Sequence, residues 1–276
     1  MTEDRVKILS GHLHKDSVLH GHAVGSGYRI VAEHFAEIDS TQVYLHEKKL
    51  SELLELNDPF LMYVASADYQ SAGKGKGSRA WFHDRDSKSL ALSLMFLIPE
   101  SMLGESPFIT QILAVSAIQV LPDFPLKIKW PNDLMLNHHK VGGIVAQLCD
   151  SRAMIIGIGI NISTPNFVLN SLLIGSENRW PPTSLSSVSD KFVETKLLRR
   201  DLLEKFSENL NLFFANSINF INLVSNHQYL FNQEIQFRVG DTIWSGIHEG
   251  LDEKGGLKIK TKHGMKFFYS GEIIYM

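Results

Sequence analysis

The feature that most constrains the fold is a set of short apolar segments that follow one another with little chain between them. They cover residues 126–130, 134–136, 141–148 and 154–160. Alternating and continuous apolar runs of this length are typical of β-strands. The connections are too short for crossover helices, so neighbouring strands should pair antiparallel. The sequence therefore predicts an α+β fold with a mixed β-sheet rather than a doubly wound one.

Apolar residues recur at helical spacing in three segments, residues 40–56, 108–121 and 194–229. Asp39 lies three residues before Gln42, a spacing that predicts a capping box at the start of the first helix. Pro122 should end the second helix, because proline lacks the amide hydrogen that a helix needs. Strands are predicted between these two helices, at residues 61–65 and 90–96.

The pattern of polar and apolar residues changes at both ends of the chain. After Asn232, short β runs alternate with glycines, which predicts a small all-β module over residues 231–276. Residues 1–34 are polar and irregular and predict an N-terminal arm, leaving residues 35–230 as the main domain. Four histidines occur in that arm as two pairs, each with a spacing of two residues, but no cysteine accompanies them. A loosely ordered arm is therefore favoured and no metal site is assigned. The four histidines are His12, His14, His20 and His22.

Composition limits the function classes that fit this chain. Its 276 residues carry a formal net charge of −3, so no overall field attracts nucleic acid or an anionic membrane, and any anion site must be local. The one cysteine, Cys149, excludes an intramolecular disulfide and is predicted as a buried structural thiol. No apolar stretch reaches the roughly 20 residues of a membrane span, and the N-terminus lacks a signal-peptide pattern. A cytoplasmic protein without membrane contact is therefore expected.

The most informative polar segment runs from Lys129 through Trp130-Pro131-Asn132 to Asp133, and Lys140 and Gly142-Gly143 follow it. A turn fixed by proline would present an amide and a carboxylate, and the returning chain would place a lysine opposite them. This arrangement suits an anionic, nucleotide-like ligand. An ordinary turn with Trp130 as a core anchor is the alternative reading.

A second polar segment, from Gln70 to Trp81, interleaves glycines with the cations Lys74, Lys76 and Arg79. Glycines let backbone amides approach a ligand, and the cations supply the charge that a phosphate or carboxylate needs. The segment is not a nucleoside-triphosphate P-loop, because neither Gly-Lys pair is followed by serine or threonine. Taken alone, it could equally be a solvated, flexible turn.

Five motifs in this order resemble the biotin–protein ligases. They are Ser40-Thr41-Gln42, Gln70 with the glycine–lysine loop, Lys129 to Asp133, Lys140-Val-Gly-Gly143, and Gly157 to Asn161. The resemblance covers roughly residues 35 to 276 and implies a mixed sheet backed by helices, with a small SH3-like barrel at the C-terminus. Such enzymes use ATP, biotin and Mg²⁺ to form biotinyl-5′-AMP. They then pass biotin to a lysine of the biotin carboxyl carrier domain of a biotin-dependent carboxylase.

The resemblance also implies roles for individual residues. Lys140 and Lys76 would be catalytic, with Lys140 contacting the reacting carboxylate and phosphate. Asn132 and Asp133 would organise the nucleotide, and Asp133 would contact the metal. The other residues expected to bind the substrates or support these contacts are Ser40, Thr41, Gln42, Gln70, Gly73, Lys74, Gly75, Arg79, Trp81, Lys129, Gly143 and Asn161.

The sequence departs from the family pattern in three places. Lys74 and Lys76 stand where arginines are usual, and lysine lacks the planar two-pronged contact of arginine. Gln42 replaces an asparagine. Residues 82–89 are one residue longer than usual and lack the customary proline and glycine. Two alternatives to an active ligase therefore stay open, namely an impaired paralogue that binds biotin or the adenylate, and a lipoate ligase.

Some relatives carry a DNA-binding winged helix-turn-helix before the ligase domain. The roughly 35 residues that precede the ligase motifs here are too few and lack a helical pattern, so no DNA binding is expected. A homodimer stays open, and the sequence does not specify the acceptor carboxylase.

Overall fold

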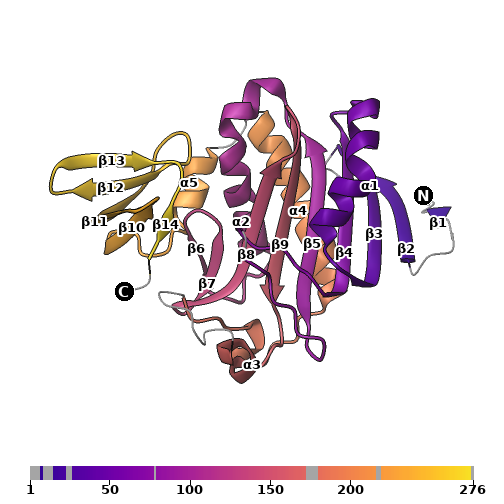
Figure 1. Ribbon diagram of the computed structural model, residues 1–276, viewed down its shortest axis with the longest axis horizontal. Helices are drawn as coiled ribbons and strands as arrows, with labels where there is room; N and C mark the ends of the chain where they lie inside the picture. Colours follow the sequence, from indigo (N-terminus) through magenta and orange to yellow (C-terminus); the bar gives the residue numbers. More distant parts are fainter. Residues whose placement is uncertain are drawn as a thin grey trace.

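The computed structural model describes residues 7–8, 15–22, 27–77, 79–171, 180–215 and 219–274. They form a nine-stranded sheet with helices on both faces and a separate five-stranded sheet at the C-terminus (Figure 1). The large sheet contains β1 (Lys7–Ile8), β2 (Lys15–His22), β3 (Arg29–Ile38), β4 (Leu61–Gln70), β5 (Ser89–Leu97), β6 (Leu126–Lys129), β7 (Asp133–Leu136), β8 (His139–Leu148) and β9 (Ala153–Asn161). The helices are α1 (Thr41–Leu56), α2 (Ile109–Val120), α3 (Asn166–Ser171), α4 (Thr195–Phe214) and α5 (Phe220–Ser225), with 3-10 turns η1 (Glu100–Phe108) and η2 (Leu185–Ser187).

The strand order of the large sheet is β1-β2-β3-β4-β5-β9-β8-β7-β6. Only β3 and β4 pair in parallel, and α1 makes the crossover between them. The remaining neighbours are antiparallel, including β6 to β9, which are joined by short hairpins. The predicted α+β class, mixed sheet and antiparallel hairpins are confirmed.

Helices bury apolar side chains on each face of this sheet. Leu45 and Leu53 of α1 pack on one face against Tyr63, while α2 and α4 cover the other (Figure 1). The predicted helix near residue 40 is confirmed, but its cap is not Asp39. Ser40 is the N-cap and accepts from Val43 N, whereas Asp39 accepts from the Ser71 hydroxyl group. The prediction failed because both residues are good caps and only the backbone turn selects one.

Two further expectations need correction. Part of the predicted irregular arm is β-structure, since β2 pairs antiparallel with β3, and β1 pairs with β2. Pairing to a sheet edge supplies hydrogen bonds that the polar sequence does not reveal. His12 and His14 lie outside the described residues. Cys149, predicted to be buried, is partly exposed.

The C-terminal sheet contains β10 (Glu234–Val239), β11 (Thr242–Leu251), β12 (Leu257–Thr261), β13 (Gly264–Phe268) and β14 (Glu272–Ile273), in the order β13-β12-β11-β10-β14. All its strands pair antiparallel, as expected for an SH3-like module. Trp130 joins the two sheets: its Nε1 donates to the Gly255 carbonyl at 3.0 Å, and its ring lies 5.7 Å from Phe237. Among the described residues, no helix has the length and apolar content to span a membrane.

Candidate active site

A cavity of about 700 Å³ lies across the middle of the large sheet, beneath the loop that follows β4. Glycines of β8 and β9 form part of its wall, where side chains from other segments rest directly on the backbone. A Cβ added at Gly159 would lie 2.4 Å from the Trp81 ring, and one at Gly157 would lie 3.0 Å from Ser93 Oγ. The backbone of these glycines is therefore in close contact with its neighbours, and a larger residue would displace them.

The end of the cavity nearest α1 presents uncharged hydrogen-bonding groups. Gln70 Oε1 accepts from Thr41 N at 2.8 Å and from Thr41 Oγ1 at 3.0 Å. Thr41 Oγ1 also shares a hydrogen bond with Ser93 Oγ at 2.7 Å. Because these bonds occupy the Gln70 oxygen, its Nε2 amide remains to donate to a ligand, and it lies 3.2 Å from where a Cβ at Gly73 would be. A buried set of neutral donors and acceptors suits an amide-like group.

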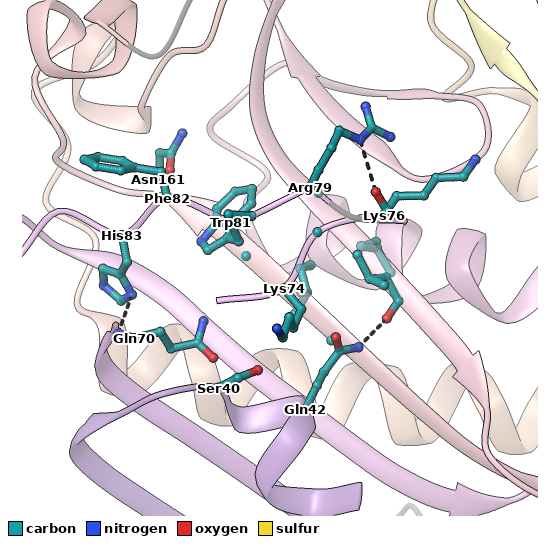
Figure 2. Close-up of a pocket in the computed structure, with 18 of the residues that line it drawn as sticks. Ser40, Gln42, Gln70, Lys74, Lys76, Arg79, Trp81, Phe82, His83 and Asn161 are labelled. Carbon is teal, nitrogen blue, oxygen red and sulfur yellow. Dashed lines mark hydrogen bonds between the residues drawn. The ribbon is translucent and has the colours of Figure 1, made fainter. Parts of the chain in front are cut away.

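Gln42 closes the side of this end. Its Nε2 donates to the Val145 carbonyl of β8 at 2.9 Å (Figure 2). The side chain passes over Gly157, where an added Cβ would lie 3.1 Å from Gln42 Cγ. The extra methylene relative to asparagine therefore lets Gln42 reach across to β8.

The other end of the cavity carries charge. Asp133 lies between two lysines, with Oδ2 2.9 Å from Lys129 Nζ and Oδ1 2.6 Å from Lys140 Nζ. Burial would raise the pKa of Asp133, but the two ammonium groups more than offset this and hold its pKa well below the usual range. The Lys129 side chain is 2% exposed and that of Lys140 is 31% exposed, so Lys140 faces the cavity. Two cations and one anion leave a net positive site that suits an anion.

Backbone contacts fix the turn that carries Asp133. Asn132 Nδ2 donates to the Ile144 carbonyl at 2.6 Å, and Ile144 N donates to the Asn132 carbonyl at 2.8 Å. The Trp130–Pro131 peptide bond is cis. On β9, Asn161 Nδ2 donates to the Thr183 carbonyl at 3.0 Å. These contacts leave the polar residues of the turn little freedom to move.

The described residues of the glycine–lysine loop, 73–77 and 79–81, form a hairpin. Trp81 N donates to the Gly73 carbonyl at 2.9 Å, and Gly75 N donates to the Arg79 carbonyl at 2.8 Å. At the tip of the hairpin, Lys76 Nζ donates to the Gly271 carbonyl at 3.3 Å. Burial lowers the pKa of Lys76, against the opposing charge of Glu272. The loop is therefore seated on the C-terminal sheet.

Glu272 brings a carboxylate from that sheet to the cavity. Its Oε1 lies 3.4 Å from Arg79 Nη1, and the residue lines the cavity wall. Figure 2 shows Lys74, Lys76, Arg79 and Trp81 around the loop. The loop thus presents its cations close to the charged end formed by Lys140.

The segment after Trp81, which departs from the family pattern, is held by contacts of its own. Arg85 makes a two-pronged ion pair with Glu37, at 2.8 and 2.7 Å, and its guanidinium group lies 4.1 Å from the centre of the Tyr69 ring. Ser87 Oγ donates to Thr164 Oγ1 at 2.9 Å. The missing proline and glycine are therefore replaced by side-chain anchors.

Fourteen of the sixteen predicted site residues line the cavity. The exceptions, Gly73 and Lys129, lie behind the wall and support it. Gly157 and Gly159 lie in the fifth motif but were given no site role, although glycines within a strand mark close approach. The sequence carried no comparable signal for several other lining residues. Among them are Ser93, His83, Trp180 and Glu272.

Comparisons with known proteins agree with this geometry. Residues 35–161 match the biotin/lipoate A/B protein ligase family, and residues 230–276 match the biotin protein ligase C-terminal domain. The bifunctional ligase/repressor BirA of Bacillus spizizenii is 30% identical over 244 residues, which cover 86% of this chain and 71% of that protein. The biotin--[acetyl-CoA-carboxylase] ligase of Paracoccus denitrificans is 24% identical over 216 residues, 75% of this chain and 87% of that one.

A solved structure adds the fold to this similarity. The biotin protein ligase from Aquifex aeolicus in complex with biotin and ATP matches with a TM-score of 0.71 and 26% identity, and the match covers 88% of this chain and 97% of that one. The resemblance predicted from the ordered motifs is confirmed. The chain belongs to the biotin–protein ligases, the family that joins biotin to protein in an ATP-dependent reaction.

Proposed function

We propose that this chain forms biotinyl-5′-AMP in the cavity across the large sheet and then transfers biotin to a lysine of a carrier domain. The observation that carries the proposal is the chemical difference between the two ends of the cavity. Thr41 and Gln70 offer neutral hydrogen bonds at one end, and Lys140 beside Asp133 offers positive charge at the other. Biotin has the same asymmetry, with an uncharged ureido ring and a carboxylate at the end of its chain.

The first step brings two anions together. A biotin carboxylate oxygen attacks the α-phosphorus of ATP, a new P–O bond forms, and the bond from this phosphorus to the bridging oxygen breaks to release pyrophosphate. Lys140 and Lys76 would offset the repulsion and stabilise the charge that spreads over the phosphoryl oxygens. The loop above would keep water from the reactive anhydride.

In the second step the carrier lysine attacks the acyl carbon of the adenylate. A C–N bond forms, the bond from the acyl carbon to the phosphate oxygen breaks, and AMP leaves as an anion while the amine loses a proton. The same cations would stabilise the leaving AMP. Lys140, which lies at the charged end and is partly exposed, serves both steps in this scheme.

The residues present fit a magnesium ion that arrives with ATP, because a carboxylate oxygen that pairs with a lysine keeps a second lone pair for a metal. Within the described part of the chain, no three His, Cys, Asp or Glu side chains gather as a metal site, and each Asp133 oxygen already pairs with a lysine. Mg²⁺ binds readily to phosphate oxygens and water with only one or two protein carboxylates. We propose Asp133 as the protein contact, and the bound metal would neutralise part of the phosphate charge.

We propose a biotin carboxyl carrier domain as the acceptor and the cytoplasm as the location. A single cysteine and the need for ATP fit a reducing, ATP-containing compartment. The acceptor follows from the family, in which one relative is a ligase for acetyl-CoA carboxylase.

One assay tests the function. The protein is incubated with ATP, Mg²⁺, a biotin carrier domain and labelled biotin or labelled lipoate, and the label on the carrier is measured. Biotin transfer is expected. Transfer of lipoate alone would instead identify a lipoate ligase, and biotin binding without transfer would identify an impaired paralogue.

A further inference from the structure

We infer that His83 is a positioning residue for the biotin end of the cavity and that it acts through the backbone of Gln70. This inference rests on the proposed binding of biotin beside Gln70. His83 belongs to residues 82–89, the segment that departs from the family pattern, so no matching motif assigns it a role. Its side chain lines the cavity and is almost fully buried.

The hydrogen bond between His83 and β4 determines which nitrogen of the imidazole ring carries the proton. His83 Nδ1 accepts from Gln70 N at 3.2 Å (Figure 2). A ring nitrogen that accepts cannot carry a proton, so the proton of the neutral ring lies on Nε2. Burial lowers the pKa of His83, against the opposing effect of Asp68 and Asp84, and this favours the neutral ring that the bond requires.

Gln70 is consequently bound by two other residues in addition to its strand pairing with Ile38. His83 accepts from its backbone N–H, and Thr41 donates twice to its side-chain oxygen. Gln70 is the last residue of β4, where the strand gives way to the loop and the ladder of the sheet ends. Without His83, the backbone N–H of Gln70 would be buried without an acceptor, and the position of the Nε2 donor would rest on Thr41 and on the pairing of Gln70 with Ile38 of β3.

The ring of His83 is also packed against β4. Its centre lies 5.5 Å from that of Tyr69, and the Arg85 guanidinium group lies over the same Tyr69 ring. Arg85 in turn is bound to Glu37 of β3. Residues 83 and 85 therefore pack against the end of β4 on one side, while Thr41 of α1 binds Gln70 on the other.

A purely structural role explains this histidine poorly. Among the residues that the structure describes, His83 Nε2 is buried and has no hydrogen-bond partner. A buried donor without a partner lowers stability, which offsets the gain from the Gln70 bond. Replacing the ring by an apolar one of similar volume should therefore change the melting temperature little while releasing Gln70.

Two substitutions separate these roles. In His83→Asn, the amide oxygen can take the place of Nδ1 and accept from Gln70 N. In His83→Phe, the ring volume is kept and the acceptor is lost. Calorimetry without ATP measures the Kd for biotin, and steady-state assays with a carrier domain measure kcat and the KM of each substrate.

We expect His83→Phe to raise the biotin Kd and KM about five- to tenfold, the effect of losing one hydrogen bond from a binding site. The KM for ATP and kcat should change by less than about twofold, because the charged end is untouched. His83→Asn should bind biotin about as the wild type does. An unchanged biotin Kd in His83→Phe would overturn the inference, as would equal losses for biotin and ATP.

A third variant covers the case in which His83→Phe does not fold. His83→Gln places its amide near the position of Nε2 and away from Gln70 N, so it should weaken biotin binding where His83→Asn does not. Equal binding by the two amide variants would contradict the inference. A wild-type chain that binds biotin without transferring it would contradict the proposed ligase activity and leave the binding test of His83 intact. A wild-type chain that does not bind biotin would overturn both.

Discussion

Replacing Asp133 by asparagine should destabilise the whole protein, because Asp133 balances a lysine that has almost no access to water. The Lys129 side chain is 2% exposed, its ammonium group lies 2.9 Å from Asp133 Oδ2, and the centre of the Trp180 ring is 5.8 Å away. Removing one partner of a buried ion pair leaves the other charge uncompensated, which costs about 3 to 5 kcal/mol. The asparagine oxygen can still accept one hydrogen bond from Lys129, so we expect a loss near the lower limit, about 3 kcal/mol.

For a chain of this size, a loss of about 3 kcal/mol lowers the melting temperature by roughly 6 to 12 °C. The same carboxylate makes stability depend on pH. The pKa of Asp133 is lower in the folded chain than in the unfolded one, where it is about 3.9. Its contribution is therefore complete well above that value and disappears as the pH falls below it toward the folded pKa. Asp133→Asn should lack this part of the acid transition.

Calorimetry or fluorescence melting without substrates measures the effect. Asp123→Asn is the matched control, since Asp123 pairs with Lys191 at the surface, where both side chains are more than half exposed and the pair contributes little. The double variant Asp133→Asn with Lys129→Met should recover most of the loss, because no buried charge remains. The reasoning would be refuted if Asp133→Asn melted within about 2 °C of the wild type, or if the double variant were no better than the single one.

Three further changes test the site and the C-terminal sheet. Lys140→Ala should lower the rate of biotin-dependent pyrophosphate release at least about a hundredfold while keeping the fold, and a near-normal rate would remove Lys140 from the mechanism. Gly159→Ala places a Cβ 2.4 Å from the Trp81 ring and should raise the KM values of the substrates, whereas Gly104→Ala, with no atom within 4 Å, should not. Burial lowers the pKa of His248 to about 4, so its neutral form is favoured on folding and stability should fall by about 2 kcal/mol from pH 7 to pH 5. His248→Phe should lack this loss when its melting temperature is measured at both pH values.

The hairpins from β6 to β9 could be predicted because short connections leave antiparallel pairing as the only choice. The position of β2 could not be predicted, since a strand at a sheet edge is selected by its partner β3 rather than by its own pattern. The prediction of Asp39 as the cap of α1 failed for a local reason. Asp39 and Ser40 are both good caps, and the Ser71 hydroxyl group engages the former.

The candidate site could be predicted where its charged residues lie close together along the chain. Asp133 and Lys140 are joined by one hairpin, so their meeting follows from its register. Glu272 is different, because it reaches Arg79 across 193 positions of sequence and only the docking of the C-terminal sheet brings them together. His83 was not predicted either, since the sequence around a lone histidine in an irregular segment does not indicate which N–H group will donate to its ring.

The contacts that fix the loop indicate how well its lysines can bind a phosphate in place of arginines. Arginine would contribute two parallel donors to a phosphate, and lysine contributes a point charge whose direction is set by its surroundings. Here backbone hydrogen bonds close the hairpin, and the Gly271 carbonyl holds the ammonium group of Lys76. Glu272 already partly neutralises Arg79, so an incoming phosphate must compete with this carboxylate for the cation. The affinity of the loop for an anion therefore depends on the position of the C-terminal sheet. A substitution in that sheet should weaken the binding of the nucleotide more than the binding of biotin.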